Sequence, residues 1–319
     1  MSRQFRGMLA AYKPRGMISK DLSRWIERQV GKQKLGHVGT LDPMAEGVLC
    51  LLFGSATRLQ DQLLELPKTY LFDMKLGMET DTLDLDGKVL SEVDATHMTR
   101  EAIAALLPGF RGRIKQVPPV FSAVKYQGRP LYDYARKNQD SDVPVDSLAR
   151  EVTVEHLEIK AFEPGLVTLE ARCSKGTYIR SLVRDIARAA GTTACLSRLV
   201  RTEASGIRAD ACASLEQIET AIKAGPGNFE AMLLPPEKLA LGLPVWQSVE
   251  HDCCARLRRG QQVSVSSSQW LENLRTPHPS TTGAMTLMLI DPQGVAFGLG
   301  EAKMTEGGRF LITMKRGLS

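Results

Sequence analysis

The chain lacks the patterns that would place it at once in several large classes of protein. No stretch of its 319 residues approaches the length of apolar sequence that crosses a bilayer, and its N-terminus carries no apolar signal core. We therefore expect a cytoplasmic protein that does not enter membranes. Its six cysteines show no framework spacing, and neither a CxxC pair nor a His-x-x-x-His set occurs, so we predict no disulfide and no metal.

The sequence also lacks an internal repeat, a low-complexity tract and a regular alternation of strands with helices, which disfavours a doubly wound Rossmann sheet. Its apolar patterns instead predict an α+β protein. The expected strands cover residues 47–53, 69–76, 152–162, 166–173 and 196–207, and the expected helices cover residues 21–30, 56–64, 100–107, 178–190 and 215–224.

The length favours two domains, because 319 residues exceed what one core usually supports. A segment rich in proline and leucine, LLPPEKLALGLP at 233–244, predicts the boundary between them. Three short β-rich pieces follow it, at 286–290, 294–299 and 310–315, and are separated by glycine and Asp-Pro turns. We expect a large domain over residues 1–243 and a small β domain over residues 244–319.

The net charge of +5 is modest but unevenly distributed. Residues 1–40 carry nine basic side chains against two acidic ones, which favours a polyanionic partner. The basic residues over 20–30 also fit the solvent face of an ordinary helix, so charge alone leaves both interpretations open. Residues 79–101 are acidic, and we expect that face to point away from phosphate.

One aspartate stands out as a candidate for catalysis. Asp42 lies in the run GHVGTLDPMAEGVL at 36–49, in a tight turn between a basic segment and a buried strand. Gly39 permits positive φ, and Pro43 fixes the residue that follows the acid. Composition alone also allows Asp42 to be a simple turn cap.

Two further motifs carry polar or aromatic groups that sequence alone can place in a core or at a site. In KTYLFDMKLGMETDTLDLDG at 68–87, Tyr70 lies on the buried face of an alternating strand, and the acids of 80–84 should cap a loop. In CSKGTYIRSLVRDI at 173–186, Thr177 fits a helix N-cap and Arg180 falls in the first turn. A cation is unfavourable at a helix start, which suggests another partner for Arg180.

A third motif has the composition of an RNA contact. QVPPVFSAVKYQGRPLYDYAR at 116–136 interleaves Lys125, Arg129 and Arg136 with four aromatic residues, which suits phosphates and exposed bases. The helical spacing of Leu131 and Tyr134 allows some of these side chains to be packing residues only. The polar tract at 137–147 suits a segment that becomes ordered on binding.

Together with AYKPRGM at 11–17, these motifs resemble the TruB family of transfer-RNA pseudouridine synthases over most of the first 205 residues. The resemblance implies a pseudouridine synthase fold, with a mixed and largely antiparallel central sheet flanked by helices. It also implies a C-terminal PUA-like domain and an RNA-gripping insertion at about 123–151. The implied catalytic residues are Asp42, Tyr70 and Arg180, and the implied substrate-binding residues are His37, Leu199, Lys13, Lys125, Arg129 and Tyr178.

The resemblance also implies roles for the catalytic residues. Asp42 attacks C1′ of a uridine or stabilises positive charge there, and Arg180 holds it ionised by a salt bridge. Tyr70 covers the base and takes part in proton transfer, while His37 fills the space that the flipped base leaves. Attack at C6 of the base stays open as a rival chemistry, and neither route needs a cofactor.

The function that the resemblance implies is an isomerase that converts uridine 55 in the transfer-RNA T-loop to pseudouridine. We expect it to bind the T-stem-loop as a monomer without an obligate protein partner. One alternative is a guide-RNA-dependent relative that modifies ribosomal RNA, against which the long insertion and short C-terminal domain argue. Another is a transfer-RNA folding chaperone of the same fold with secondary or lost catalysis, against which the set of Asp42, Tyr70 and Arg180 argues.

Overall fold

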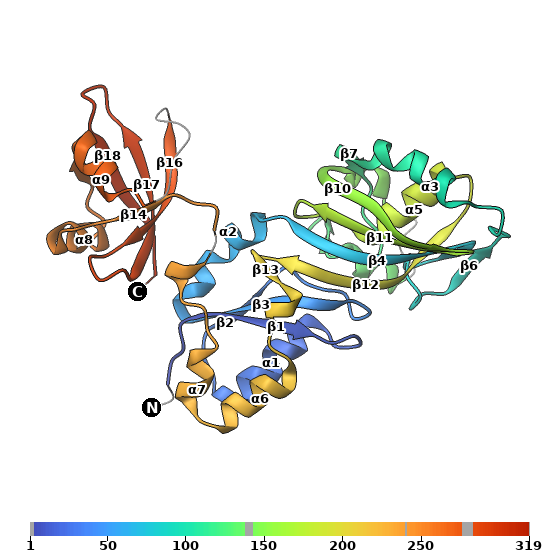
Figure 1. Ribbon diagram of the computed structural model, residues 1–319, viewed down its shortest axis with the longest axis horizontal. Coiled ribbons are helices and arrows are strands. Elements are labelled where there is room, and N and C mark those ends of the chain that lie inside the picture. The colour runs from blue at the N-terminus through green and yellow to red at the C-terminus, as the bar shows by residue number, and fades with distance from the viewer. Residues whose placement is uncertain (1–2, 138–142, 240, 276–282, 319) are drawn as a thin grey trace.

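The computed structural model describes residues 3–137, 143–239, 241–275 and 283–318. Within them the chain forms two parts, each built on its own sheet (Figure 1). The nine-stranded sheet of the first part has the order β1-β3-β12-β4-β11-β10-β7, with β2 on β3 and β13 on β12. Its strands are β1 (Gly7–Lys13), β2 (Leu35–Val38), β3 (Glu46–Phe53), β4 (Lys68–Leu76), β7 (Gly112–Gln116), β10 (Arg150–Glu163), β11 (Leu166–Cys173), β12 (Ala194–Ala204) and β13 (Ile207–Arg208).

The pairing of these strands confirms the predicted sheet. The contact between β3 and β12 is parallel, and the other pairings within the described sheet are antiparallel. Each of the five predicted strands is present within a few residues of its expected bounds, whereas β1, β2 and β7 were not predicted.

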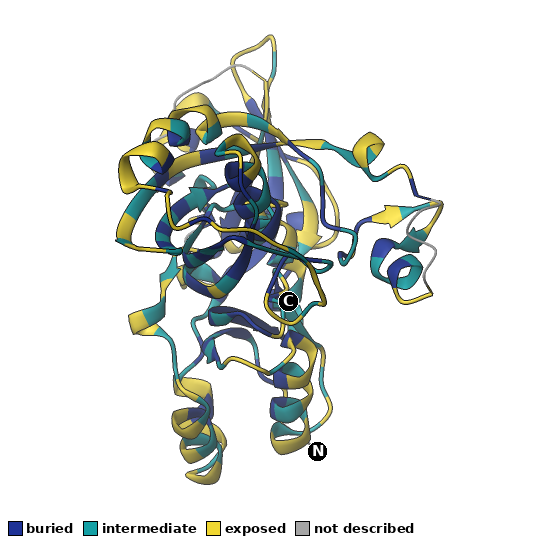
Figure 2. Cartoon of the chain, turned by 90° about the vertical axis from the view of Figure 1, so that its right-hand side faces the viewer, coloured by how far each residue is buried: buried dark blue, intermediate teal, exposed yellow. Residues whose placement is uncertain are grey.

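Helices cover this sheet, and their exposed and buried sides are seen in Figure 2. Helix α5 packs against β4 and β12 in the main core, where the buried side of β4 carries Phe72, Met74 and Leu76. Toward the β1 end of the strand order, α1, α6 and α7 pack on β1 and β3. The helices are α1 (Ser19–Val30), α2 (Gln60–Glu65), α3 (Arg100–Leu106), α4 (Leu131–Ala135), α5 (Ile179–Ala189), α6 (Leu215–Lys223) and α7 (Pro226–Ala231).

The predicted cap of α5 is wrong. Tyr178 is the N-cap residue, and the hydroxyl of Thr177 instead donates to the carbonyl of Ser174 at 3.0 Å. Thr177 therefore closes the turn that leads into the helix, one residue too early to cap it. No helix among the described residues is long and apolar enough to span a membrane.

Two small hairpins project from the first part. Strands β5 (Met78–Thr80) and β6 (Val89–Glu92) form one, and β8 (Lys125–Tyr126) with β9 (Arg129–Pro130) forms the other. The second hairpin belongs to the predicted insertion, which has a small core of its own around Leu131. Residues 138–142 of the polar tract, which we predicted to become ordered on binding, lie outside the described residues.

The second part is a five-stranded sheet of order β14-β16-β17-β18-β15. Trp246 is buried in its core, and Trp270 stacks on Phe310 with 4.4 Å between ring centroids. The elements are β14 (Val245–Gln247), α8 (His251–Arg258), β15 (Val263–Val265), α9 (Ser267–Asn273), β16 (Ala284–Ile290), β17 (Ala296–Met304) and β18 (Phe310–Gly317). The exact boundary at residues 243 and 244 stays a prediction.

Hydrogen bonds join the second part to the first. Arg6 donates from Nε to the carbonyl of Leu318 at 3.3 Å and from Nη2 to that of Ala296 at 2.5 Å. Ser55 also donates to the carbonyl of Leu318, at 2.5 Å, and Arg316 donates to that of Arg58 at 2.7 Å. The end of β18 is therefore fastened to the segment before β1 and to the turn after β3.

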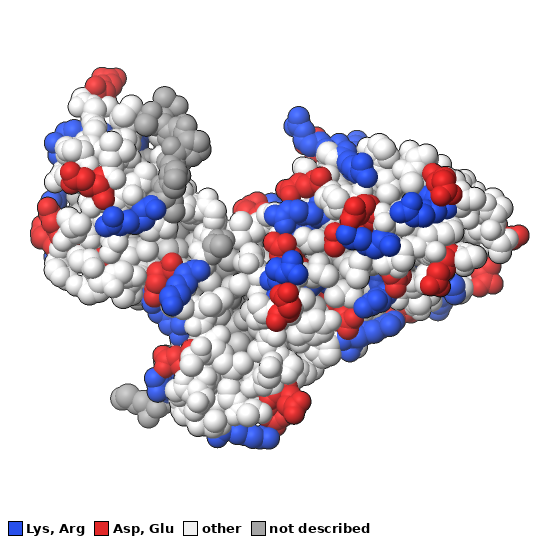
Figure 3. All heavy atoms as spheres, viewed as in Figure 1, with Lys and Arg blue, Asp and Glu red and all other residues white. Residues whose placement is uncertain are grey.

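Charges on the surface in Figure 3 mostly lie beside charges of the other sign. Lys160 on β10 pairs with Glu158 and Glu170, and Arg172 on β11 pairs with Glu155 on β10 and Glu203 on β12. A surface whose charges offset one another attracts a polyanion weakly.

Candidate active site

Asp42 and Arg180 form an ion pair at the end of the loop between β2 and β3. Oδ2 of Asp42 lies 2.9 Å from Nη2 of Arg180, with the Asp42 side chain 38% exposed and the Arg180 side chain 6% exposed. The turn itself is closed by the backbone, because the amide of Ala45 donates to the Asp42 carbonyl at 3.1 Å. The carboxylate is therefore paired with an arginine and remains partly exposed.

The local sequence holds this loop in place. Ser19, at the start of α1, accepts a hydrogen bond from the Leu41 amide at 2.9 Å and donates one to the Leu41 carbonyl at 3.0 Å. At the start of β3 only glycine fits, because a Cβ on Gly47 would lie 2.3 Å from the carbonyl oxygen of Arg201. Gly39 has the positive φ that its position in the motif suggested, at 68°.

Arg180 is held from three further directions. It donates to the carbonyls of Thr82 at 2.9 Å and Phe121 at 3.1 Å, and its Nε lies 3.7 Å from Oδ2 of Asp84. Thr82 stands in the acidic loop, whereas Phe121 stands at the base of the predicted insertion. The guanidinium thus links Asp42 to both segments, which explains a cation at a helix start.

Sequence reasoning missed Asp84 as a site residue. The expectation that the acidic stretch points away from phosphate stays a prediction, but Asp84 itself is buried beside Arg180. Burial raises the pKa of this carboxyl, while hydrogen bonds from Thr82 and the Asp86 amide and the Arg180 charge lower it. As predicted, these acids also cap their loop, because Asp84 accepts from the Asp86 amide at 3.1 Å and Asp81 accepts from the Lys88 amide at 2.8 Å.

A small cavity of about 100 Å³ lies directly beside the ion pair. It is far smaller than the roughly 300–1,000 Å³ of pockets that enclose drug-sized ligands, so it suits one planar group of a larger substrate. Five of the expected site residues are among those that line it, and the full lining is Thr40, Leu41, Asp42, Tyr70, Thr177, Tyr178, Ile179, Arg180 and Leu199.

Tyr70 stands opposite Arg201 across the pairing of β4 with β12. Burial raises the pKa of the Tyr70 hydroxyl, and the nearby charge of Arg201 opposes that rise. Sequence reasoning missed Arg201, although a signal was present. It lies two residues after Leu199 in the same strand, so the two side chains point to the same side.

The other expected residues lie outside this pocket. His37 lines a separate depression of about 620 Å³ with Lys20, Arg24 and Gln60, and its Nε2 is 3.2 Å from the Thr40 hydroxyl. Burial and the nearby charge of Arg201 lower its pKa.

Lys13 is buried rather than open to a phosphate. Its ammonium donates to the carbonyls of Pro14 at 3.0 Å and Met17 at 2.6 Å, and burial lowers its pKa to about 8. Lys125 and Arg129 lie in the β8–β9 hairpin, where the Arg129 guanidinium sits 4.3 Å from the centre of the Tyr134 ring. The role of each in binding stays a prediction.

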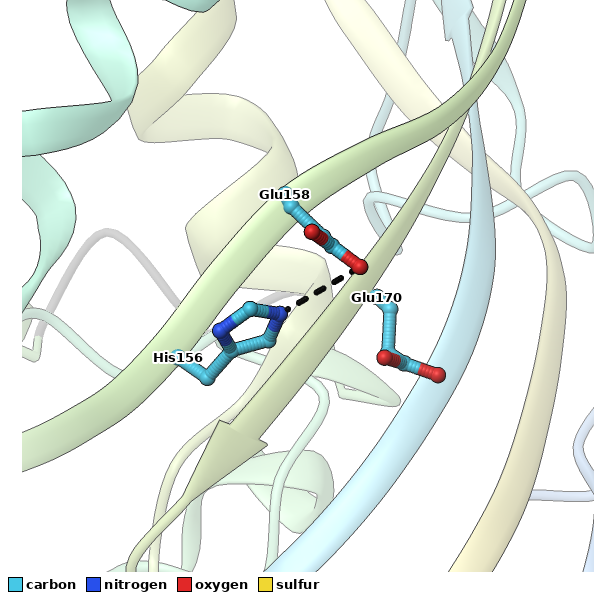
Figure 4. Close-up of side chains that lie close together, drawn as sticks. All are labelled: His156, Glu158 and Glu170. Carbon is cyan, nitrogen blue, oxygen red and sulfur yellow. Dashed lines mark ion pairs between the residues drawn. The ribbon is translucent and has the colours of Figure 1, made fainter.

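Among the described residues, one group of side chains has the atoms to hold a metal ion, and it is far from Asp42 in sequence. His156 and Glu158 on β10 lie beside Glu170 on β11 (Figure 4). The ammonium of Lys160 already pairs with both carboxylates, at 3.0 Å from Glu170. A metal would have to displace that ammonium, so these residues are better explained as a surface ion-pair network.

Comparison with solved structures identifies the fold. The chain superposes on a chain of the structure titled "Crystal Structure of a Cbf5-Nop10-Gar1 Complex" with a TM-score of 0.74 and 23% identity, covering 99% of this chain and 85% of that one. A substrate-bound structure, "Structure of H/ACA RNP bound to a substrate RNA containing 2'-deoxyuridine", gives a TM-score of 0.73 at 21% identity, covering 98% and 85%. This likeness confirms the pseudouridine synthase fold with its C-terminal PUA-like β domain.

Sequence comparison narrows the class. Residues 27–179 match the family described as "TruB family pseudouridylate synthase (N terminal domain)". A protein of Pseudomonas aeruginosa (strain UCBPP-PA14) named "tRNA pseudouridine synthase B" is 36% identical over 308 residues, 96% of this chain and 94% of that one. Another of that name from Azoarcus sp. (strain BH72) is 43% identical over 230 residues, 72% and 74% of the two chains. The chain belongs to the TruB family.

Proposed function

We propose that this protein is an isomerase that converts uridine 55 in the T-loop of transfer RNA to pseudouridine. The observation that supports the chemistry best is the pair of Asp42 and Arg180 at the edge of a pocket that also holds Tyr70 and Leu199. The substrate follows from the names of the relatives, which are transfer-RNA pseudouridine synthases. The expected site of action is the cytoplasm.

The reaction needs one carboxylate that attacks and then leaves. Asp42 forms a bond to C1′ as the N1–C1′ bond breaks, and the electron pair of that bond leaves with the base. Arg180 pairs with the carboxylate and holds it in position at the edge of the pocket. The base then turns and rejoins C1′ through C5, which releases Asp42. A proton leaves C5 and one arrives at N1, so no atom is gained and no cofactor is required.

The pocket supplies the surroundings of the base. Tyr70 and Leu199 both line it and offer a ring and an apolar side chain for the base to pack against. Extracting a uridine from a folded RNA costs on the order of a few kcal/mol. We assign His37, outside the pocket, to the space that the base vacates, and Lys125 and Arg129 of the insertion to contacts with the RNA backbone.

One assay tests this function and its alternatives. Tritium release is measured from an unmodified transfer-RNA transcript that carries 5-tritiated uridine, with the protein alone. Release from position 55 that is lost in Asp42→Asn, but kept in the exposed control Asp252→Asn, supports the proposal. Inactivity until a guide RNA is added supports the ribosomal-RNA alternative, and tight binding without release supports the chaperone.

A further experiment separates the two chemical routes. Quenching a single turnover traps Asp42 bonded either to the sugar or to C6 of the base, and mass spectrometry of the labelled peptide distinguishes them. A sugar adduct supports attack at C1′. Gel filtration with light scattering at working concentration tests the proposed monomer, which acts without an obligate protein partner.

A further inference from the structure

Arg201 lies at the junction of three strands directly behind the pocket. In the strand register, Arg201 pairs with Tyr70 on β4 and with Gly47 on β3. The side chain is buried, and it donates from Nε to the Val48 carbonyl at 2.8 Å and from Nη2 to the Gly39 carbonyl at 2.9 Å. Gly39 precedes Asp42 and Val48 follows it, so one guanidinium holds both ends of the loop that carries the aspartate.

The same guanidinium also acts on Tyr70. Arg201 and Tyr70 are directly opposed across the pairing of β4 with β12, so their side chains lie on the same face of the sheet, and the charge of Arg201 lowers the Tyr70 pKa. Negative charge on Cys173 of β11 or on Asp42 of the loop acts in the opposite direction and raises the Tyr70 pKa. Arg201 is therefore the cation whose charge opposes the rise in the Tyr70 pKa that burial causes.

The region behind the pocket carries positive charge without ion pairs. Lys13, Lys68 and Arg201 are all buried, and among the described residues none of them has a carboxylate within 4.0 Å. Lys13 and Lys68 each feel the charge of Arg201, which with burial lowers the pKa of both to about 8. Unpaired buried charge costs stability, and a group nearby that becomes negative during the reaction would offset that cost.

We propose that Arg201 is a positioning residue of the reaction, which fixes Tyr70 relative to the Asp42 loop and stabilises negative charge on the Tyr70 oxygen. The proposal rests on the proposed function. After the base rejoins through C5, Tyr70 gives its proton to N1, directly or through water, and then takes the proton from C5. Between the two transfers its oxygen is negative, and a preorganised cation stabilises that charge. The residue ends unchanged.

A double-mutant cycle tests the proposal. Arg201→Met and Arg201→Lys are made in the wild type and in Tyr70→Phe, and single-turnover rates are measured with saturating transcript. We expect Arg201→Met to slow the wild type by about 100-fold, the scale of general acid–base catalysis, and Arg201→Lys to recover part of that loss. In Tyr70→Phe, the same substitutions should change the single-turnover rate by less than about twofold, because the hydroxyl on which Arg201 acts is absent.

Arg172→Met on β11, the strand on the other side of β4, is the matched control, since Arg172 is a partly exposed residue paired with Glu155 and Glu203. It should leave both rates unchanged. An equal loss from Arg201→Met in both backgrounds would overturn the proposal, because Arg201 would then act only by holding the loop. An undiminished wild-type rate would overturn it as well.

A second measurement needs no activity and covers variants that fold poorly. Tyrosine is labelled with 13C at Cζ, the Tyr70 signal is identified by its loss in Tyr70→Phe, and its titration midpoint is followed by NMR in the free protein. The midpoint should rise in whichever of Arg201→Met and Arg201→Lys remains folded, and stay in place in Arg172→Met. An unmoved midpoint contradicts the inference. Absence of tritium release from the wild type would contradict the proposed function instead.

Discussion

Oδ2 of Asp42 and Nη2 of Arg180 lie 2.9 Å apart, although the two residues are far apart in sequence. Asp42 lies in the loop before β3, and Arg180 lies in the first turn of α5. The pair leaves the carboxylate partly open toward the pocket while its counterion is buried. An aspartate with this arrangement is held in place by its partner and can still reach a substrate atom.

Asp42→Asn should therefore abolish turnover but keep RNA binding. The amide has nearly the same shape, yet it cannot attack C1′ as a carboxylate does. We expect the single-turnover rate to fall by more than about 1,000-fold. The dissociation constant for transfer RNA, measured by filter binding, should change by less than about threefold. A tenfold change in this constant corresponds to about 1.4 kcal/mol, and neutralising one charge at the site should change the binding free energy by less than that. Loss of binding in parallel with turnover would contradict this role.

Arg180→Met should weaken both the fold and the reaction. It removes the charge that offsets Asp42 and Asp84, and it leaves the carbonyls of Thr82 and Phe121 without their donor. Removing one partner of a buried ion pair costs about 3 kcal/mol, which urea unfolding will measure. As a control, Arg188→Met removes an exposed arginine from the same helix and should cost less than about 1 kcal/mol.

Asp84→Asn should slow the reaction without affecting binding. The amide keeps a hydrogen-bonding oxygen for Thr82 and the Asp86 amide but removes the charge beside Arg180. We expect a fall of about tenfold in rate, equivalent to roughly 1.4 kcal/mol. The exposed neighbour Asp86→Asn should behave as wild type.

The pH profile offers a second check on Asp84. Because burial raises its pKa, the wild-type rate should fall toward that of Asp84→Asn as pH drops through the raised pKa. A variant rate that equals the wild type at every pH would show that the charge has no part in the reaction.

Lys68 should impose a pH dependence on stability. Burial lowers its pKa to about 8, below the value of 10.5 expected in the unfolded chain, so the folded state holds this proton less tightly. The cost to stability is complete below pH 8 and disappears as pH rises toward 10.5. Urea unfolding should show that the free energy of unfolding of the wild type, relative to that of Lys68→Met, increases between pH 8 and pH 10. A difference between the two proteins that does not change with pH would contradict the shift.

His37 should contribute to RNA affinity as a neutral ring. Its lowered pKa keeps the imidazole uncharged at neutral pH, so stacking rather than charge is available to it. His37→Ala should weaken transfer-RNA binding by about 5- to 150-fold, equivalent to the 1–3 kcal/mol of a base–aromatic stack. His37→Phe should recover most of the affinity, and neither change should alter the rate at saturating RNA much. Equal losses from both substitutions would rule out stacking.

The central sheet was largely predictable because its strands alternate. On β4, Phe72 and Met74 are buried and separated by partly exposed residues, which is the pattern of a half-buried strand. The edge strand β7 was missed because its residues, from Gly112 to Gln116, are mostly exposed and carry no such alternation. The strand β1 was missed because nearly all of it is buried, so it shows no period of two.

The candidate site was predictable only where a motif carried it. Asp42, Tyr70, Arg180 and Leu199 were expected, and the structure brings them to one pocket, although their roles stay proposals. Asp84 and Arg201 were not expected, because their importance lies in contacts between segments far apart in the chain. A charged residue in a loop or a strand is usually exposed, and sequence alone does not show that both of these are buried.

The hydrogen bonds from Arg6 and Ser55 to Leu318 have a consequence for chain connectivity. Because the first and last described segments touch, we expect the fold to tolerate a change in the position of the chain ends. A circular permutant of this chain, with its two ends joined by a short linker and new ones opened at Gly225 between α6 and α7, should fold with the catalytic pocket and the β domain unchanged.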